Sequence, residues 1–134
     1  ITNIIFRIKN KRAYATGDLG FFDKKNLLHI VGRKDNTIKI SGFRVDTLEV
    51  EALVNIQFGF TNSCLFISNT NGINILCLAI ESKKKIDTGT IFFFLRTKLP
   101  NYSIPKKIIF IKKFPLNQNN KIDRKKIKLI SYEK

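Results

Sequence analysis

The sequence is short of the residues from which several common kinds of site are built. It contains no methionine, no tryptophan, two cysteines and one histidine in 134 residues. Two cysteines are too few for a disulfide scaffold and lack the spacing of metal ligands, so we expect Cys64 and Cys77 to be reduced core residues. His29 stands alone in an apolar run, which disfavours a histidine-based zinc site or active site.

Long apolar runs are also missing. No run approaches the roughly eighteen residues that a membrane helix needs, and no charged-then-apolar signal pattern opens the chain. We therefore expect a cytoplasmic protein without a membrane partner. Because the chain has no methionine and Ile1 lies within an apolar segment, we expect it to be an excerpt of a longer protein.

Acidic residues are scarce, with 10 Asp and Glu against 25 Lys and Arg, for a formal net charge of +15. Most of the excess lies between Leu95 and Lys134. Such a surplus attracts polyanions, acidic proteins and anionic ligands. The plainer interpretation of most individual lysines is a solvated, lysine-rich surface.

What the chain does contain is globular in composition, with 43% hydrophobic and 26% charged residues. From about residue 36 onward we expect an α+β unit with a short mixed sheet and two or three helices, preceded by strands from a different structure. Residues 32–35, polar with a glycine, form the expected linker. The expected strands are 4–8, 27–31, 38–40, 43–45, 64–67, 73–80 and 108–111, and the expected helices are 47–58, 88–99 and 123–129.

Four short segments carry motifs that occur in a distinctive order. They are YATGDL at 14–19, GRKD with IKISGFRV and EVE within 32–51, LPNYSIP at 99–105, and PLNQNNKIDR at 115–124. In this order they resemble motifs of the adenylate-forming enzymes, which comprise acyl-CoA synthetases, nonribosomal peptide synthetase adenylation domains and luciferases. The resemblance implies that 1–34 are the tail of a large N-terminal domain and 35–134 a mobile C-terminal domain.

The resemblance also implies chemistry between two anions. These enzymes join a carboxylate to the α-phosphate of ATP, release pyrophosphate, and pass the acyl group to a thiol, usually on a phosphopantetheine arm. Lys121 matches their catalytic lysine, and an ammonium on a flexible stem suits a charge carried by a moving loop. The alternative is an ordinary surface lysine, which the matching residues on both sides disfavour.

Four further residues match nucleotide-binding positions of the family. Asp18 matches the aspartate that accepts both ribose hydroxyls, although a turn-forming aspartate after Gly17 is the alternative. Arg33 matches an arginine near the ribose and phosphates, and Thr16 a weaker polar contact to the nucleotide. Tyr14 matches a position at the adenine end, with a core aromatic as an equal alternative.

Three residues match positions that differ between the two half-reactions. Asp35 matches the hinge at which the small domain reorients. Lys39 and Gly42 match the strand and turn that replace the lysine loop at the active site after that rotation. A simple turn glycine is the alternative for Gly42, and Glu51 is expected to be structural.

Some residues depart from the family pattern. Asn120 replaces the glycine before the catalytic lysine, and we expect it to keep the loop because asparagine tolerates left-handed geometry. Ser103 replaces a methionine, and Ser41 a common basic residue. None of these changes removes a charged catalytic group. They are nevertheless compatible with a degenerate enzyme as well as with an active one.

The sequence around Lys121 is more similar to the corresponding motif of amino-acid-activating members than to that of acyl-CoA synthetases. It therefore favours an amino acid as the small carboxylic acid substrate and a carrier protein, rather than CoA, as the thiol partner. Carrier proteins are typically acidic, so a basic face would speed their encounter. ATP is the expected nucleotide, and Mg²⁺ is expected from the family with its ligands outside this chain.

The family's pyrophosphate loop and the large domain that forms most of its pockets are absent from these residues. We therefore expect no adenylation by this chain alone, and the large N-terminal domain as its first partner. One alternative is a non-catalytic remnant kept for interactions. Another is a basic module that binds an acidic protein or nucleic acid, although no RNA-binding aromatic signature or helix-turn-helix pattern supports nucleic acid.

Overall fold

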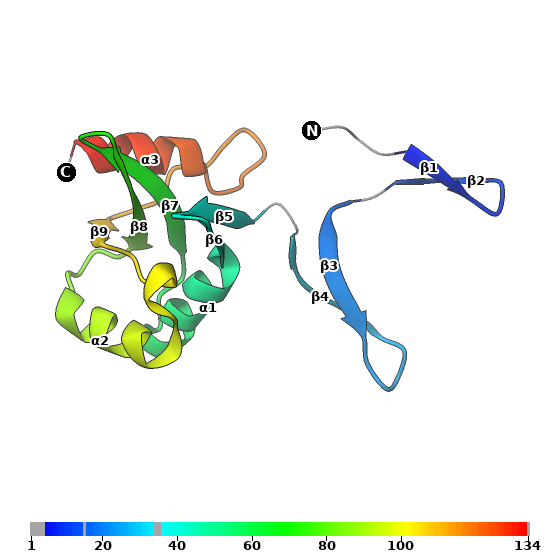
Figure 1. Ribbon diagram of the computed structural model, residues 1–134, viewed down its shortest axis with the longest axis horizontal. Coiled ribbons are helices and arrows are strands. Elements are labelled where there is room, and N and C mark those ends of the chain that lie inside the picture. Colours follow the sequence, from blue (N-terminus) through cyan, green and yellow to red (C-terminus); the bar gives the residue numbers. More distant parts are fainter. Residues whose placement is uncertain (1–4, 15, 34–35, 134) are drawn as a thin grey trace. The chain divides into compact units, whose positions relative to one another are not determined.

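The computed structural model describes residues 5–14, 16–33 and 36–133, and the chain divides into two compact units, 1–36 and 37–134 (Figure 1). This division falls two residues beyond the boundary expected from the motifs. Gly32 and Arg33 were expected in the linker but lie in strand β4 (Leu28–Arg33). The reason is pairing: β4 continues along its partner strand as far as the Asp18–Arg33 pair.

The first unit consists of two antiparallel hairpins. Strand β1 (Ile5–Ile8) pairs with β2 (Lys11–Tyr14), and β3 (Asp18–Phe22) pairs with β4. The strands expected near 4–8 and 27–31 are confirmed, whereas β2 and β3 were not predicted. Basic residues open β2 and a glycine interrupts β3, so neither segment looks like a strand by itself, and each forms by pairing with the strand next to it.

The second unit begins with a hairpin that leads directly into a helix. Strands β5 (Thr37–Ile40) and β6 (Phe43–Asp46) are joined by Ser41 and Gly42, both with positive φ, as a tight hairpin turn requires. Helix α1 (Thr47–Phe58) starts where the Asp46 carboxylate accepts the N–H groups of Leu48 and Glu49, and it ends at left-handed Gly59. The helix start and end expected from the sequence are both confirmed.

A three-stranded mixed sheet forms the centre of this unit. Strand β7 (Ser63–Thr70) pairs antiparallel with β8 (Ile73–Glu81), which pairs in parallel with β9 (Lys107–Ile111). The parallel pair is connected through α2 (Thr88–Lys98) and the short 3₁₀ helix η1 (Asn101–Ser103), and α3 (Arg124–Tyr132) ends the chain. The expected α+β class with a short mixed sheet is therefore confirmed.

Strand alternation divides the core between the two faces of the sheet. Leu65, Leu78 and Ile80 are buried with residues of α1 and α2. The intervening Cys64 and Ala79 are instead buried with Ile127 of α3 and with other side chains on that face. Figure 1 shows the resulting layers, with α3 on one side of the sheet and α1 and α2 on the other.

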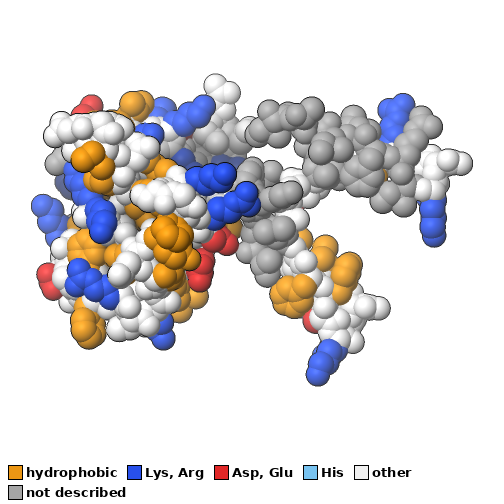
Figure 2. Space-filling view, viewed as in Figure 1, with side chains coloured by type: hydrophobic (Ala, Val, Ile, Leu, Met, Phe, Trp, Pro, Cys, Tyr) orange, Lys and Arg blue, Asp and Glu red, His pale blue; other side chains and the backbone are white. Residues whose placement is uncertain are grey.

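The surface carries the excess of positive charge. Figure 2 shows lysine and arginine side chains spread over the visible face of the second unit, with apolar side chains between them. Among the described residues, no helix is both long and apolar enough to cross a membrane.

Candidate functional site

The loop between β9 and α3 carries Lys121. The Asn117 N–H donates to the Lys121 carbonyl at 2.7 Å, the Asn120 N–H donates to the Asn117 carbonyl at 3.0 Å, and Leu116 forms a bridge with Ile122. These contacts close the loop into a short hairpin-like turn. The Lys121 side chain is exposed to solvent.

Two asparagines fix the backbone of this loop. The Asn117 carboxamide oxygen accepts the N–H of Asn119 at 2.9 Å and that of Lys121 at 3.1 Å. Asn120 has φ of 58°, in the left-handed region that the glycine of the family pattern would adopt easily. The expectation that asparagine tolerates the left-handed conformation at this position is confirmed.

An ion pair at the foot of the loop was missed by sequence reasoning. Arg124, three residues after Lys121, forms a bidentate pair with Glu51 of α1, at 2.8 Å from Nη1 to Oε1 and 3.0 Å from Nη2 to Oε2. Burial lowers the pKa of Arg124, but the hydrogen bonds and electrostatic interactions with Glu51 and Cys64 together outweigh this, and the net shift is upward. The sequence does show that Glu51 is a charged residue within an apolar stretch that contains Val50 and Val54. It does not show the partner of Glu51, because Arg124 lies 73 residues further along the chain.

The β5–β6 hairpin carries Lys39 and Gly42. Lys39 lies opposite Arg44 in the register, and both side chains are exposed. Gly42 has φ of 81°, and a Cβ placed there would meet no atom within 4 Å. The turn geometry therefore favours glycine here, whereas packing within the chain does not require it.

A hollow of about 380 Å³ lies beside this turn. Ser41 and Tyr102 contribute to its lining, together with Lys106. The Tyr102 ring stacks on Phe43, with ring centroids 4.3 Å apart and planes inclined by 6°. Both rings are partly exposed, so the hollow joins a small aromatic surface to a cationic side chain.

The first unit holds the residues that match nucleotide-binding positions. Asp18 and Arg33 are register partners at one end of the β3–β4 hairpin, although they are 15 positions apart in the numbering. The Asp18 N–H donates to Thr16 Oγ1 at 3.2 Å, and Tyr14 is the last residue of β2. The proposed hinge residue, Asp35, lies outside the described residues.

His29 takes part in a local contact of the β3–β4 hairpin. Its Nε2 lies 2.8 Å from Asp23 Oδ2, and its ring stacks on Phe21. The hydrogen bond to His29 is the largest cause of the lowered pKa of Asp23, and the backbone N–H of Leu27 adds to it. His29 thus orders the turn between two strands.

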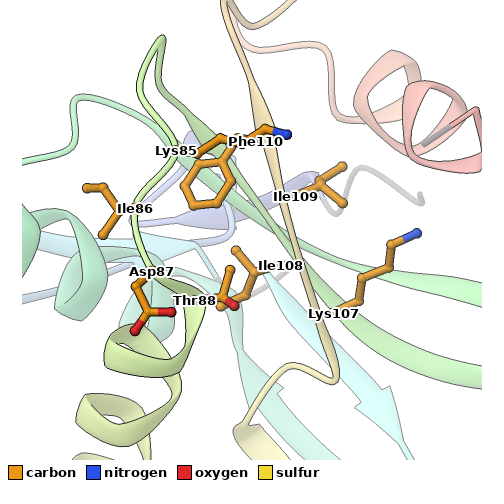
Figure 3. A pocket seen from close by; sticks show the side chains of 8 residues that line it. All are labelled: Lys85, Ile86, Asp87, Thr88, Lys107, Ile108, Ile109 and Phe110. Carbon is orange, nitrogen blue, oxygen red and sulfur yellow. The ribbon is translucent and has the colours of Figure 1, made fainter.

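A second hollow, of about 450 Å³, lies between the start of α2 and strand β9 (Figure 3). Lys85 and Lys107 line it, together with Asp87, and it contains none of the candidate residues. The Asp87 carboxylate already accepts the N–H groups of Gly89 and Thr90 as the cap of α2. In the described part of the chain, no cluster of three or more His, Cys, Asp or Glu residues is arranged to hold a metal ion.

No protein-family model matches the sequence. Individual proteins do. Over 132 residues it is 33% identical to the D-alanine–D-alanyl carrier protein ligase of Lactococcus lactis, covering 90% of this chain and 26% of the ligase. Over 111 residues it is 34% identical to nonribosomal peptide synthetase 5 of Aspergillus fumigatus, covering 82% of this chain and 5% of the synthetase.

Solved structures agree with these matches. The chain superposes on Klebsiella oxytoca NpsA, solved in complex with 3-hydroxyanthranilyl-AMSN, with a TM-score of 0.77 and 21% sequence identity, covering 97% of this chain and 27% of NpsA. This chain belongs to the adenylate-forming superfamily. It corresponds to the C-terminal region of those enzymes, and it spans about a quarter or less of each of these relatives.

Replacement of Asn120 tests the left-handed position in the lysine loop of this adenylate-forming chain. Asn120→Val should lower the free energy of unfolding by about 1–2 kcal/mol because a β-branched residue tolerates positive φ poorly, whereas Asn120→Gly should leave it nearly unchanged. Urea unfolding followed by circular dichroism measures both. Gln118→Val is the matched control, since Gln118 is exposed on the same loop and has no positive φ; an equal loss in both valine variants would contradict the explanation.

The raised pKa of the Cys64 thiol predicts how fast this residue reacts with an alkylating reagent at a given pH. Burial raises its pKa to about 11, with Arg124 opposing the shift. The reactive thiolate is therefore rare near neutral pH, and alkylation of Cys64 at pH 8 should be at least about 100-fold slower in the folded chain than in urea. Mass spectrometry of the iodoacetamide-labelled peptides measures the rate at Cys64 separately from that at Cys77. Equal rates in the folded and unfolded chains would show that the thiol is accessible.

Proposed function

We propose that this chain is the C-terminal part of an ATP-dependent ligase that activates a carboxylic acid, most specifically an amino acid, as an acyl-adenylate. In this proposal, residues 1–34 are the tail of the large N-terminal domain and 35–134 are the mobile C-terminal domain. A phosphopantetheine thiol then attacks the acyl-adenylate, so that a thioester forms and AMP leaves. Because the large domain is needed for most of the substrate pocket, the chain alone should not catalyse adenylation.

The observation that carries the proposal is the geometry at Lys121. Its backbone N–H and carbonyl are both hydrogen-bonded within the loop, while its side chain projects into solvent. A fixed backbone with a free ammonium suits a cation that must reach a carboxylate and a phosphate outside its own domain. We assign Lys121 to the approach of these two anions, where it offsets their repulsion and the negative charge of the transition state.

The nucleotide-binding assignments follow the hairpin of the first unit. Asp18 is proposed to accept the two ribose hydroxyls, and Arg33 to lie near the ribose and phosphates. Their register pairing supports a shared role at one end of the β3–β4 hairpin. Thr16 and Tyr14 are proposed as weaker contacts to the nucleotide.

The second half-reaction is assigned to different residues. Asp35 is proposed as the hinge, and Lys39 and Gly42 as part of the surface that replaces the lysine loop when the thiol attacks. The exposed hairpin that carries them supports this assignment, because no atom of the described residues lies within 4 Å of a Cβ placed on Gly42. The described residues hold no ligand cluster for Mg²⁺, so no step is assigned to a metal here.

The full reading frame that contains this chain provides the direct test. Its protein should exchange pyrophosphate into ATP in the presence of one acid from an amino-acid and fatty-acid panel. Lys121→Ala should lower that exchange by about 10²–10³-fold, because it removes the charge closest to the reacting anions. Lys125→Ala is the control, since it removes an equal charge from an exposed position on α3. Exchange that survives in Lys121→Ala would remove this residue from its role, and no exchange with any acid would refute the proposed activity.

We further propose an acidic carrier protein as the thiol partner. The +15 charge of the chain supports it, as does the name of the Lactococcus relative, which is a carrier protein ligase. The value of kcat/KM for carrier acylation should fall about tenfold between roughly 0.05 and 0.5 M NaCl, because salt screens the encounter of opposite charges. Stopped-time acylation assays with the carrier and with CoA measure this. A value of kcat/KM for the carrier that does not change with salt, or a higher kcat/KM for CoA than for the carrier, would contradict the assignment.

A further inference from the structure

We propose that Glu51, Glu81 and Arg124 are positioning residues that hold both ends of the Lys121 loop. This inference rests on the proposed role of Lys121 in adenylation. None of the three residues is expected to touch the substrates. Each acts instead by fixing where the loop leaves and re-enters the folded core.

The end of the loop that leads into α3 is held by the Glu51–Arg124 pair. Glu51 is 6% exposed, and its Oε1 also accepts the Leu65 N–H at 2.8 Å. The guanidinium binds both carboxylate oxygens and approaches the Leu65 carbonyl at 3.5 Å. A planar guanidinium can make this two-pronged contact, whereas an ammonium cannot reproduce it. The first residue of α3 is therefore tied to α1 and β7 at once.

The other end of the loop is held by a second carboxylate. The Phe114 N–H donates to Glu81 Oε2 at 2.6 Å, and the other oxygen of Glu81 accepts from the Asn62 carboxamide at 3.3 Å. The Phe114 ring is 3% exposed and belongs to the core cluster under α3. Glu81 thus fixes the backbone at the point where the chain leaves the core after β9.

Between these two anchors the backbone has little freedom. The Asp123 N–H donates to the Pro115 carbonyl at 2.9 Å, which ties the two ends of the loop to each other. Ile122, next to Lys121, is partly buried and packs against the core cluster that contains Phe114. Loosening either anchor should therefore shift Lys121, and a misplacement of about 1 Å can lower a catalysed rate on the order of 10²-fold.

The test separates the two half-reactions of the protein encoded by the full reading frame. Glu51→Gln and Arg124→Lys should each lower kcat for ATP–pyrophosphate exchange by about 10- to 100-fold with the KM for ATP unchanged. Thioester formation from added acyl-adenylate should stay at the wild-type rate, because the lysine loop is not used there. Equal losses in both half-reactions, or no loss in either, would overturn the inference.

Glu81 allows a test by conservative rescue. Both Glu81 oxygens accept hydrogen bonds from uncharged donors, the Phe114 N–H and the Asn62 carboxamide. A glutamine keeps one acceptor oxygen for Phe114, and the Asn62 carboxamide can turn to present its own oxygen to the new NH2 group. Glu81→Gln should therefore retain near-normal exchange, whereas Glu81→Ala should lower it as the Glu51 variant does. Asp87→Ala is the control for general destabilisation, because it removes the cap of α2 without touching the loop. The inference fails if Asp87→Ala lowers exchange as much as Glu81→Ala while the enzyme remains folded, or if glutamine does not rescue.

Hydrogen exchange of the same protein provides a readout that needs no activity. In Glu51→Gln, the amides of Lys121 and Asp123 should exchange at least about tenfold faster, while amides of the β8–β9 pair keep their protection. If the wild-type protein shows no ATP–pyrophosphate exchange with any acid, the proposed function fails, but this measurement still decides the anchoring. Unchanged loop amides in Glu51→Gln would overturn it.

Discussion

The buried carboxylate of Glu51 is the constraint on which the second unit depends most. Its side chain is only 7% exposed, so it has lost most of its contact with water. A carboxylate in such a place is costly unless charged or polar donors replace the water. Here the donors are the guanidinium of Arg124 and the N–H of Leu65, from two different elements. Satisfying one buried charge therefore requires α1, β7 and α3 to meet at one point.

The position of α3 follows from that meeting. The helix has nine residues, of which Ile127 and Ser131 are buried, and a helix this short has little stability of its own. It is held by a cap at Asp123, by the apolar contacts of Ile127 and by the ion pair at Arg124. The lysine loop is the segment that connects this helix to β9. Its geometry is consequently set by tertiary contacts at its ends as much as by its own turn.

Features that depend on neighbouring residues could be predicted from the sequence. The start and end of α1 and the start of α2 were expected, and so was the tolerance of Asn120 for left-handed geometry. The hydrophobic pattern likewise indicated the α+β unit, and the four motifs indicated its family. These features depend on short-range chemistry, which a single sequence displays directly.

Features that depend on distant pairing were missed. Strands β2 and β3 carry charged residues and a glycine, and they become strands because a neighbouring strand pairs with them. Glu51 was expected to be structural, but nothing in its helix indicated an arginine 73 residues away. The anchoring of Phe114 by Glu81 likewise joins residues 33 positions apart. Such contacts form only when the folded core brings distant segments together, so no local sequence pattern predicts them.

The Lys121 loop separates what the fold needs from what the proposed chemistry needs. In the described part of the chain, the Lys121 ammonium has no ion-pair partner, so its charge contributes little to stability. Even so, the Asn117 side chain is committed to holding the backbone of that residue, and Asn120 adopts a conformation that most residues resist. A plain surface lysine requires neither arrangement. An ordered backbone that carries a cation unpaired among the described residues is the arrangement expected if the partner of Lys121 is a substrate, which supports the role proposed for this residue.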